Sequence, residues 1–382
     1  LQLTGETNID NMSAAQRRIL FSTINELPQS SQSILLPDFS TRAYNLNDYS
    51  KALEAIIKLN NPSLKTLALR ADFDALPITE ENEINYCSVN KGVMHACGHD
   101  VHTASLLGVV KILYALKQEW EGSIKFIFQP AEEMLPGGAQ QMIKEGVLEN
   151  PKVEKMIGQH VFPDLEVGKV GFRPGKYMAS TDELHITIKG KGGHAALPHK
   201  YNSPLLAAAK LITDLDVSFE KEKDRPSVLA IGFIEGLGST NVIPEQVKLK
   251  GTLRAMDEEF RALAHDKILA ISNAIAQAYN LEIDFDIRKG YPCLVNDEVL
   301  TKKSIAFAKQ FLGEDNVIDL PIRMTAEDFS YYSHEVPSTF YRLGTANKSK
   351  GITHGLHTSR FNIDEKSLKI GMGLMAYLAI KN

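Results

Sequence analysis

The sequence predicts an α/β protein in which a smaller α+β unit is inserted into a larger mixed-sheet domain. Buried apolar strand segments are followed by polar side chains and then by helical patterns, an order typical of α/β sheets. Residues 178–289 instead contain alternating strands and long helical patterns, and 382 residues are enough for two domains. We therefore expect a first domain over 1–177 that resumes over 290–382, on either side of the insert.

The composition is that of an ordinary globular protein and excludes several classes of partner. The net charge is −5, and no run of Lys or Arg could follow a phosphate backbone, so we expect no nucleic-acid partner. No apolar run approaches the roughly 20 residues of a spanning helix, so we expect no membrane partner. The three cysteines do not indicate a disulfide framework, and residues 1–12 lack a signal-peptide pattern. These features favour a cytoplasmic protein.

Residues 94–102 form the densest cluster of metal-binding side chains, with three histidines, one cysteine and one aspartate. A single Cys or His is usually structural, but so many ligand types in nine residues favour a metal site. Cys97 and His99 can converge on one ion only if the backbone turns between them, which Gly98 allows. The cluster is therefore predicted to be one half of a metal site.

Three predicted strands carry polar side chains to one edge of the sheet. The strand at 66–70 precedes Asp72 and Asp74, and the strand at 155–159 runs into His160. Ligands of α/β proteins bind beyond the carboxyl ends of strands, which favours a functional role for these side chains. For the two aspartates, capping of a helix or turn is an equally good interpretation.

The third of these strands, at 123–128, is followed by the adjacent carboxylates Glu132 and Glu133. Neighbouring side chains cannot usually bind the same ion in the same way. The simplest division places one glutamate on a metal and the other against a water molecule as general base. A solvated charge pair at the start of a helix is the less favoured alternative.

The remaining pattern predicts the other elements. A helix over 103–116 opens at 100–103 with its N-terminus towards the site, and a second helix covers 139–146. The insert is predicted to have the element order βαββαβ, which indicates an antiparallel sheet with helices on one face. In this order, the six elements are expected over 183–189, 203–215, 228–235, 246–254, 258–279 and 281–289. Further helices and a strand are predicted over 302–311, 338–344 and 365–380.

Six motifs together resemble the M20 metallopeptidase family, and specifically its amidohydrolase branch. This branch includes hippurate hydrolases, auxin-conjugate hydrolases and deacetylases of N-acyl amino acids or N-acetyldiaminopimelate. The resemblance covers residues 53–382, whereas the family's His-x-x-Pro-Glu motif is not found in 1–52. The motifs lie, in chain order, at 69–77, 95–100, 128–133, 190–195, 241–244 and 326–329.

The resemblance implies a mixed-sheet catalytic domain of zinc-exopeptidase type, interrupted by a ferredoxin-like lid domain that often dimerises. It also implies a centre of two divalent ions, and ligands of these types accept Zn, Mn, Co or Ni. The implied metal ligands are Cys97, His99, Glu133, His160 and His357, with the thiolate of Cys97 bridging.

The same resemblance implies roles for residues beside the metals. Glu132 would be the general base, and Asp74 would orient a metal ligand. His194 of the lid would contact the scissile carbonyl oxygen, in its own or a partner subunit's site. Asn241 and Arg254 would hold the substrate, Arg254 by gripping a carboxylate. The roles of three further histidines, His95, His102 and His354, stay open between structure and the surroundings of the site.

We therefore expect a homodimeric, metal-dependent amidohydrolase that cleaves a small N-acyl amino acid, such as an N-acetyl or N-benzoyl derivative. One alternative is a dipeptidase or aminopeptidase on the same scaffold. Another is a catalytically silent metal-dependent binding protein, although a structural site needs no spare carboxylate beside a ligand. A serine nucleophile is disfavoured because no Gly-x-Ser-x-Gly elbow is present.

Overall fold

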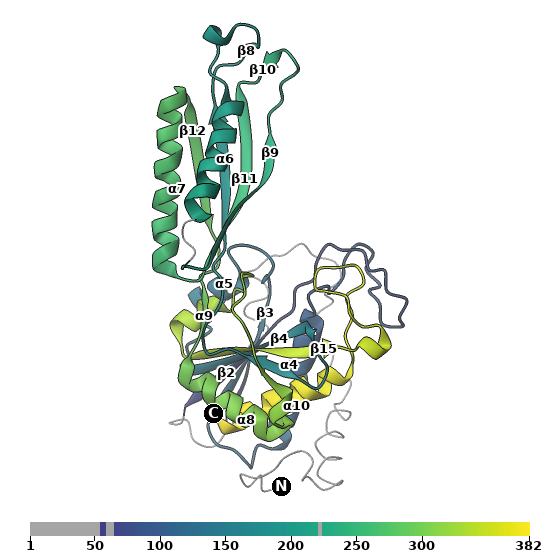
Figure 1. Ribbon diagram of the computed structural model, residues 1–382. Coiled ribbons are helices and arrows are strands. Elements are labelled where there is room, and N and C mark those ends of the chain that lie inside the picture. The colour runs from purple at the N-terminus through teal and green to yellow at the C-terminus, as the bar shows by residue number, and fades with distance from the viewer. Residues whose placement is uncertain (1–53, 59–64, 221–223) are drawn as a thin grey trace. The chain divides into compact units, whose positions relative to one another are not determined.

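The computed structural model describes residues 54–58, 65–220 and 224–382 (Figure 1). The segment 1–52, in which the family's His-x-x-Pro-Glu motif was not found, lies outside these residues. The chain divides into two compact units. Of the described residues, unit 1 comprises those up to Gly175 together with Val295–Pro321 and Tyr331–Asn382, and unit 2 comprises those of Lys176–Leu294 and Ile322–Ser330. The insert predicted at 178–289 lies within unit 2.

Unit 1 contains a seven-stranded mixed sheet, as predicted for an α/β fold. Its strand order is β1-β3-β2-β4-β15-β5-β14. The strands are β1 (Glu54–Lys58), β2 (Thr66–Asp72), β3 (Ser123–Gln129), β4 (Val153–Glu166), β5 (Val170–Phe172), β14 (Val317–Asp319) and β15 (Ser338–Ala346).

The centre of this sheet is parallel. β2 pairs in parallel with β3 on one side and with β4 on the other, and β15 continues the parallel run beside β4. Every residue of β2 and of β3 is buried, as expected for central strands with both faces covered. Since the register places Asp72 opposite Gln129, the chain segments that leave β2 and β3 emerge at the same edge.

Three long helices share one apolar core with the sheet of unit 1. They are α4 (His99–Ala115), α8 (Glu298–Leu312) and α10 (Lys366–Lys381). The core contains Leu106 and Leu113 of α4, Phe311 of α8 and Leu374 of α10, together with apolar side chains of the strands. There are two shorter helices in this part of the chain. α5 (Gly138–Lys144) follows β3, and α9 (Ser330–Glu335) precedes β15. This packing holds the first residue of α4, His99, at the edge of the sheet.

Unit 2 has the predicted βαββαβ order. Its antiparallel sheet, in the order β12-β7-β11-β9, consists of β7 (Asp182–Lys189), β9 (Ser227–Glu235), β11 (Gln246–Ala255) and β12 (Glu282–Lys289). Buried and partly exposed residues alternate along β7, and its buried Leu184, Ile186 and Ile188 pack in a core with α6 (Pro204–Glu220) and α7 (Glu258–Tyr279). A two-stranded ribbon of β8 (Gly193–His194) and β10 (Val242–Ile243) lies at one end of this unit (Figure 1).

The short strands β5, β14, β6 (Gly175–Met178) and β13 (Leu294–Asn296) were not predicted, because three or four residues carry no clear periodicity. Within the described residues, no helix has the length and apolar character needed to cross a membrane.

Candidate metal centre

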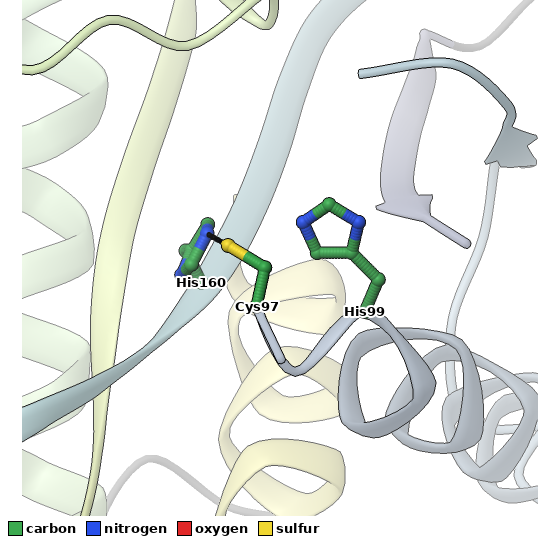
Figure 2. Close-up of side chains that lie close together, drawn as sticks. All are labelled: Cys97, His99 and His160. Atoms are coloured by element: carbon green, nitrogen blue, oxygen red, sulfur yellow. Dashed lines mark hydrogen bonds between the residues drawn. The ribbon is translucent and has the colours of Figure 1, made fainter. Parts of the chain in front are cut away.

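The loop before α4 makes the turn that the sequence requires. Gly98 adopts φ 77° and ψ 22°, a left-handed conformation that suits glycine. A β-carbon at this position would lie 2.5 Å from Cγ2 of the buried Val161, so the close approach also demands glycine. The turn directs the side chains of Cys97 and His99 to the same side, next to His160 of β4 (Figure 2).

The sulfur of Cys97 lies at the centre of the group. It is 3.5 Å from Nε2 of His160 and 3.3 Å from Nε2 of His357. His357 comes from the loop between β15 and α10, and its Nε2 lies 3.2 Å from Oε1 of Glu133. The backbone N–H of His357 donates to the carbonyl of Ala96, which ties this distant loop to the turn.

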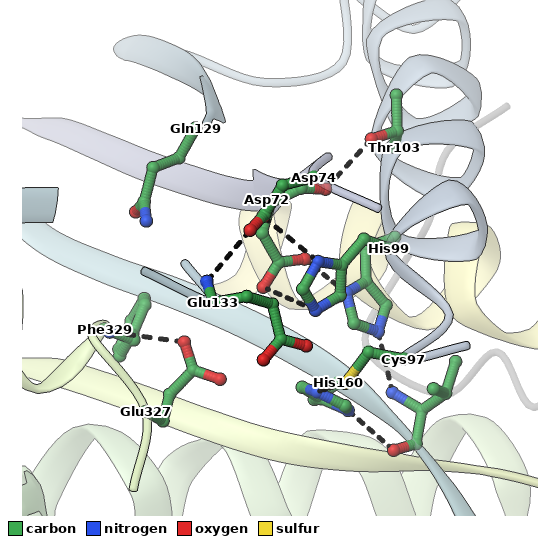
Figure 3. Close-up of polar contacts among 12 residues, drawn as sticks. Asp72, Asp74, Cys97, His99, Thr103, Gln129, Glu133, His160, Glu327 and Phe329 are labelled. Atoms are coloured by element: carbon green, nitrogen blue, oxygen red, sulfur yellow. Dashed lines mark hydrogen bonds and ion pairs between the residues drawn. The ribbon is translucent and has the colours of Figure 1, made fainter. Parts of the chain in front are cut away.

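Asp74 joins two other members of the group (Figure 3). Its Oδ1 lies 3.2 Å from Nδ1 of His99, and its Oδ2 accepts a hydrogen bond of 2.8 Å from the backbone N–H of Glu133. The other ring nitrogen, Nε2 of His99, is buried and has no hydrogen-bond partner among the described residues. Oδ2 of Asp72 lies 3.8 Å from this nitrogen, beyond hydrogen-bond distance, so Nε2 is available to a metal ion.

The donor set fits divalent metal ions. The ligand atoms of Cys97, His99 and His160 lie within 4.8 Å of one another, and so do those of Cys97, Glu133 and His357. The two groups share Cys97. Thiolate, imidazole and carboxylate are the ligands of zinc and related ions, and Nε2 of His99, which makes no hydrogen bond within the described residues, supplies a further ligand atom.

The surroundings control the charge of two of these ligands. Burial lowers the pKa of His160 well below its ordinary value, helped by the nearby Arg342, so its imidazole is neutral and able to bind a metal. Burial raises the pKa of the Cys97 thiol to about 11 in the metal-free chain. A bound cation would reverse this by stabilising the thiolate, because coordinated thiols lose their proton.

Glu132 is buried beside this group. One of its carboxylate oxygens lies within 4.8 Å of ligand atoms of His99 and Glu133. The preceding residue, Ala131, has φ 57°, a left-handed conformation that is unusual outside glycine. Ala131 lies two residues after the end of β3, so this unusual backbone directly precedes the two glutamates.

The three predicted residues of the insert lie in unit 2. His194 and Asn241 lie together at the β8–β10 ribbon, where the N–H of Ala195 donates to the carbonyl of Asn241. Arg254 lies near the opposite end of β11, about 26 Å from the start of that strand at 3.3 Å per residue. Its side chain is partly buried and forms no ion pair within the described residues. The structure therefore brings His194 and Asn241 together but holds Arg254 apart from both.

The buried group behind Asp74 was not predicted in full. Asp72 accepts from Nη1 of Arg70 at 2.6 Å, and its other oxygen lies 2.5 Å from Nδ1 of His102. Nε of Arg70 donates to Gln129. Burial alone would raise the pKa of Asp72, but the Arg70 guanidinium and the neighbouring histidines hold it well below its ordinary value. Two spacings in the sequence could have indicated this group. Arg70 and Asp72, two residues apart on a strand, point to the same face of the sheet, and His99 and His102, three residues apart on a helix, lie on the same helix face.

His95 and His354, whose roles the sequence did not decide, belong to none of the possible metal-ligand groups found among the described residues. His95 is partly buried and lines a separate cavity of about 160 Å³ that also contacts Asp100 and Glu365. His354 is exposed in the loop before His357. Neither residue is brought to the sulfur of Cys97.

Comparisons with known proteins show which family this chain is similar to. The family model for peptidase family M20/M25/M40 matches residues 68–381. The chain is 34% identical to N-acetyl-L-cysteine deacetylase of Bacillus subtilis, over 96% of this chain and 89% of the relative. It is 33% identical to N-acetyldiaminopimelate deacetylase of Priestia megaterium, over 94% and 90% of the two chains. The crystal structure of the Bacillus subtilis YXEP protein, described as a dinuclear metal binding peptidase from the M20 family, superposes with a TM-score of 0.74 at 32% identity, covering 87% of this chain and 85% of that one.

Proposed function

Because the chain belongs to peptidase family M20/M25/M40, we propose that it is a metal-dependent amidohydrolase that cleaves the amide bond of N-acyl amino acids. The observation that carries this proposal is the overlap of two groups of metal-binding side chains at Cys97. The deacetylases among its relatives support an N-acyl amino acid as the substrate class.

The proposed centre holds two divalent ions through the five predicted ligands. When bound, the ions would supply Lewis acidity, which lowers the pKa of a water molecule and polarises the amide carbonyl. Asp74 supports this centre by holding Nδ1 of His99, so that Nε2 faces the ions. The ligands proposed are Cys97, His99, Glu133, His160 and His357.

Glu132 is the proposed general base. Its carboxylate is buried next to the ligand group, so it can accept a proton from the attacking water without competition from bulk solvent. It then donates this proton to the nitrogen of the leaving amino acid. One residue thus serves as base and acid in successive steps, without a covalent intermediate.

Substrate recognition is assigned to unit 2. Arg254 is proposed to bind the carboxylate of the amino-acid part, which is consistent with a cationic side chain that has no ion-pair partner in the described structure. His194 is proposed to donate to the carbonyl oxygen of the scissile amide, and Asn241, beside it, to hold the same part of the substrate.

The two adjacent glutamates allow a matched test, because the same substitution should have different effects at each. Glu132→Gln should keep the metal content of the wild type, while kcat on an N-acetyl or N-benzoyl amino acid falls by about 100- to 10,000-fold. Glu133→Gln should lose metal as well as activity, since it replaces a carboxylate ligand by a weaker amide. Metal content by elemental analysis and steady-state kinetics measure both effects.

Unchanged turnover of the Glu132→Gln variant with full metal content would contradict the assignment of the general base. The substrate class is tested separately with metal-reconstituted protein and a panel of N-acyl amino acids and unblocked dipeptides. Faster hydrolysis of every dipeptide than of any N-acyl amino acid would favour the peptidase alternative.

A further inference from the structure

His102 is fully buried one turn after His99 on α4, and the proposed mechanism does not use it. The three-residue spacing places both rings on the same face of the helix, and their centroids are 5.4 Å apart. Together with Asp72, these two histidines offer ligand atoms within 4.8 Å of one another. His102 could therefore be a further metal ligand, or it could hold other ligands in place.

The hydrogen bonds of His102 decide between these roles. Its Nε2 lies 2.9 Å from the backbone nitrogen of Val161, and its Nδ1 lies 2.5 Å from Oδ1 of Asp72. A backbone N–H can only donate, so Nε2 must be the acceptor and Nδ1 must carry the proton that is donated to the carboxylate. Both ring nitrogens are occupied by the protein, which leaves no lone pair for a metal.

The peptide groups on either side of Val161 connect His102 to a proposed ligand. The N–H of Val161 donates to His102, and the carbonyl of Val161 lies 2.7 Å from Nδ1 of His160. When Nδ1 of His160 donates to this carbonyl, its Nε2 has a free lone pair on the side of Cys97, whose sulfur is 3.5 Å away. The position of Val161 therefore sets the direction of the metal-binding nitrogen of His160.

The other end of this chain of hydrogen bonds is also fixed. Asp72 is held by the guanidinium of Arg70 at 2.6 Å, and Asp72, His102 and Val161 are all completely buried. The side chain of Val161 also lies against the ligand turn, where a β-carbon on Gly98 would meet it at 2.5 Å. A movement of Val161 would thus disturb His160 and the turn that carries Cys97 together.

We propose that His102 is a positioning residue for the metal centre. Anchored by Asp72, it holds the N–H of Val161 and so directs Nε2 of His160 towards the metal. The inference rests on the proposed function, because it takes His160 as a metal ligand. Partners that orient metal-binding histidines typically contribute about 10- to 100-fold in metal affinity or activity, so the effect is measurable.

Two substitutions separate positioning from ligation. The amide of a glutamine carries one donor and one acceptor group, which can replace Nδ1–H and Nε2, but it is a poor ligand for zinc. A leucine removes both hydrogen bonds at similar volume. Leu106→Ala serves as the control, because it weakens the core one turn further along the same helix without removing a hydrogen bond of the chain from Asp72 to His160.

The experiment measures zinc affinity by competition with a chelator for the wild type and the three variants. His102→Leu should bind zinc about 10- to 100-fold more weakly. His102→Gln should recover most of this loss, and Leu106→Ala should bind as the wild type does. Wild-type affinity in His102→Leu, or an equal loss in His102→Gln, would overturn the inference.

A second measurement uses the intact wild-type protein and does not depend on the folding of a variant. In protein labelled with ¹⁵N-histidine and loaded with ¹¹³Cd, His102 should show the neutral tautomer protonated at Nδ1 and no coupling to cadmium, whereas His160 should show coupling through Nε2. Cadmium coupling at His102 would overturn the inference. If the wild type binds no metal at all, the proposed function fails as well, so the two failures can be told apart.

Discussion

Several residues of the metal centre have backbone conformations that the chain would not adopt by itself. Gly98 lies in the left-handed region, and so do two residues with side chains, Ala131 before the glutamate pair and the proposed ligand His357, at φ 57° and 60°. Such conformations cost free energy and persist only where the surrounding structure enforces them. Because these residues lie at or beside the proposed ligands, we infer that their unusual backbone conformations orient the ligand side chains.

Replacement of Gly98 tests this interpretation. Gly98→Ala should lower the free energy of unfolding by more than the roughly 1–2 kcal/mol of the left-handed backbone alone, because the new β-carbon meets Val161. It should also weaken metal binding, since the turn carries Cys97 and His99. Urea unfolding and zinc affinity are the measurements.

Gly92 provides a matched control. It has φ 82°, but a β-carbon there would meet nothing within 4 Å. Gly92→Ala should show only the backbone cost and normal zinc affinity. Equal losses of stability in the two variants, with zinc affinity unchanged in both, would show that the approach of Gly98 to Val161 is unimportant.

At the scale of elements, the sequence predicted best where periodicity was long. The 22-residue amphipathic helix α7 coincides with the predicted 258–279, and the alternating strands β7 and β11 lie within one residue of their predicted bounds. α6 continues to Glu220, five residues beyond its predicted end at 215, because its last turns are partly exposed and lack a strong apolar pattern. Strands as short as β5 depend on pairing with distant residues, which no local pattern contains.

A buried ion pair links the strand β7 of unit 2 to the long helix α7. Asp182 of β7 accepts a hydrogen bond of 3.0 Å from Nε of Arg261 and lies 2.6 Å from Nε2 of His265, both on α7. Burial alone would raise the pKa of Asp182, but these two partners lower it to about 2.

This pKa sets a pH dependence of stability. The carboxyl has a pKa of about 3.9 in the unfolded chain, so its contribution is complete above about pH 5 and is lost as the pH falls towards 2. Asp182→Asn should therefore be less stable than the wild type at pH 7, and the difference in free energy of unfolding should shrink between pH 5 and pH 3. Urea unfolding at each pH measures it.

Asp286→Asn is the control, because Asp286 pairs with Arg288 on the surface, where both side chains are more than half exposed. Such a pair contributes at most about 1 kcal/mol, so this variant should differ little from the wild type at any pH. A difference for Asp182→Asn that stays constant from pH 7 to pH 3 would rule out the ionised carboxylate as the source of the stability.

At the scale of the whole molecule, the sequence predicted which residues belong to the site better than it predicted the hydrogen bonds that join them. The proposed ligands come from the turn before α4, the segment after β3, the strand β4 and the loop before α10. The strand pattern predicted that the segments at the ends of β2, β3 and β4 meet at one edge of the sheet. The assignment of individual ligands, and the inclusion of the distant His357, came from the resemblance to a family. The link from Asp72 through His102 and Val161 to His160 depends on the packing of β2, α4 and β4, so it appears only in the structure.

The separation within unit 2 bears on the proposed dimer. His194 lies in the ribbon beyond the start of β11 and Arg254 near the end of that strand, so one copy of unit 2 cannot bring both to the same small substrate. We therefore propose that each site of the expected homodimer combines Arg254 of one subunit with His194 of the other.

Complementation tests this shared site. His194→Ala and Arg254→Ala should each be nearly inactive alone. Co-expressed in equal amounts, they should regain about a quarter of wild-type activity, because half of randomly paired dimers are mixed and each mixed dimer has one intact site. Activity of the mixture no higher than that of the separate variants would contradict a shared site.

The central claim is that two divalent ions share the sulfur of Cys97, and titration of the metal-free protein with Co²⁺ tests it most directly. Absorption from thiolate-to-cobalt charge transfer should grow until two equivalents are bound. It should disappear in Cys97→Ser and persist when either other cysteine, Cys87 or Cys293, is replaced by serine. Binding of fewer than two ions, or a charge-transfer band that survives in Cys97→Ser, would contradict the account.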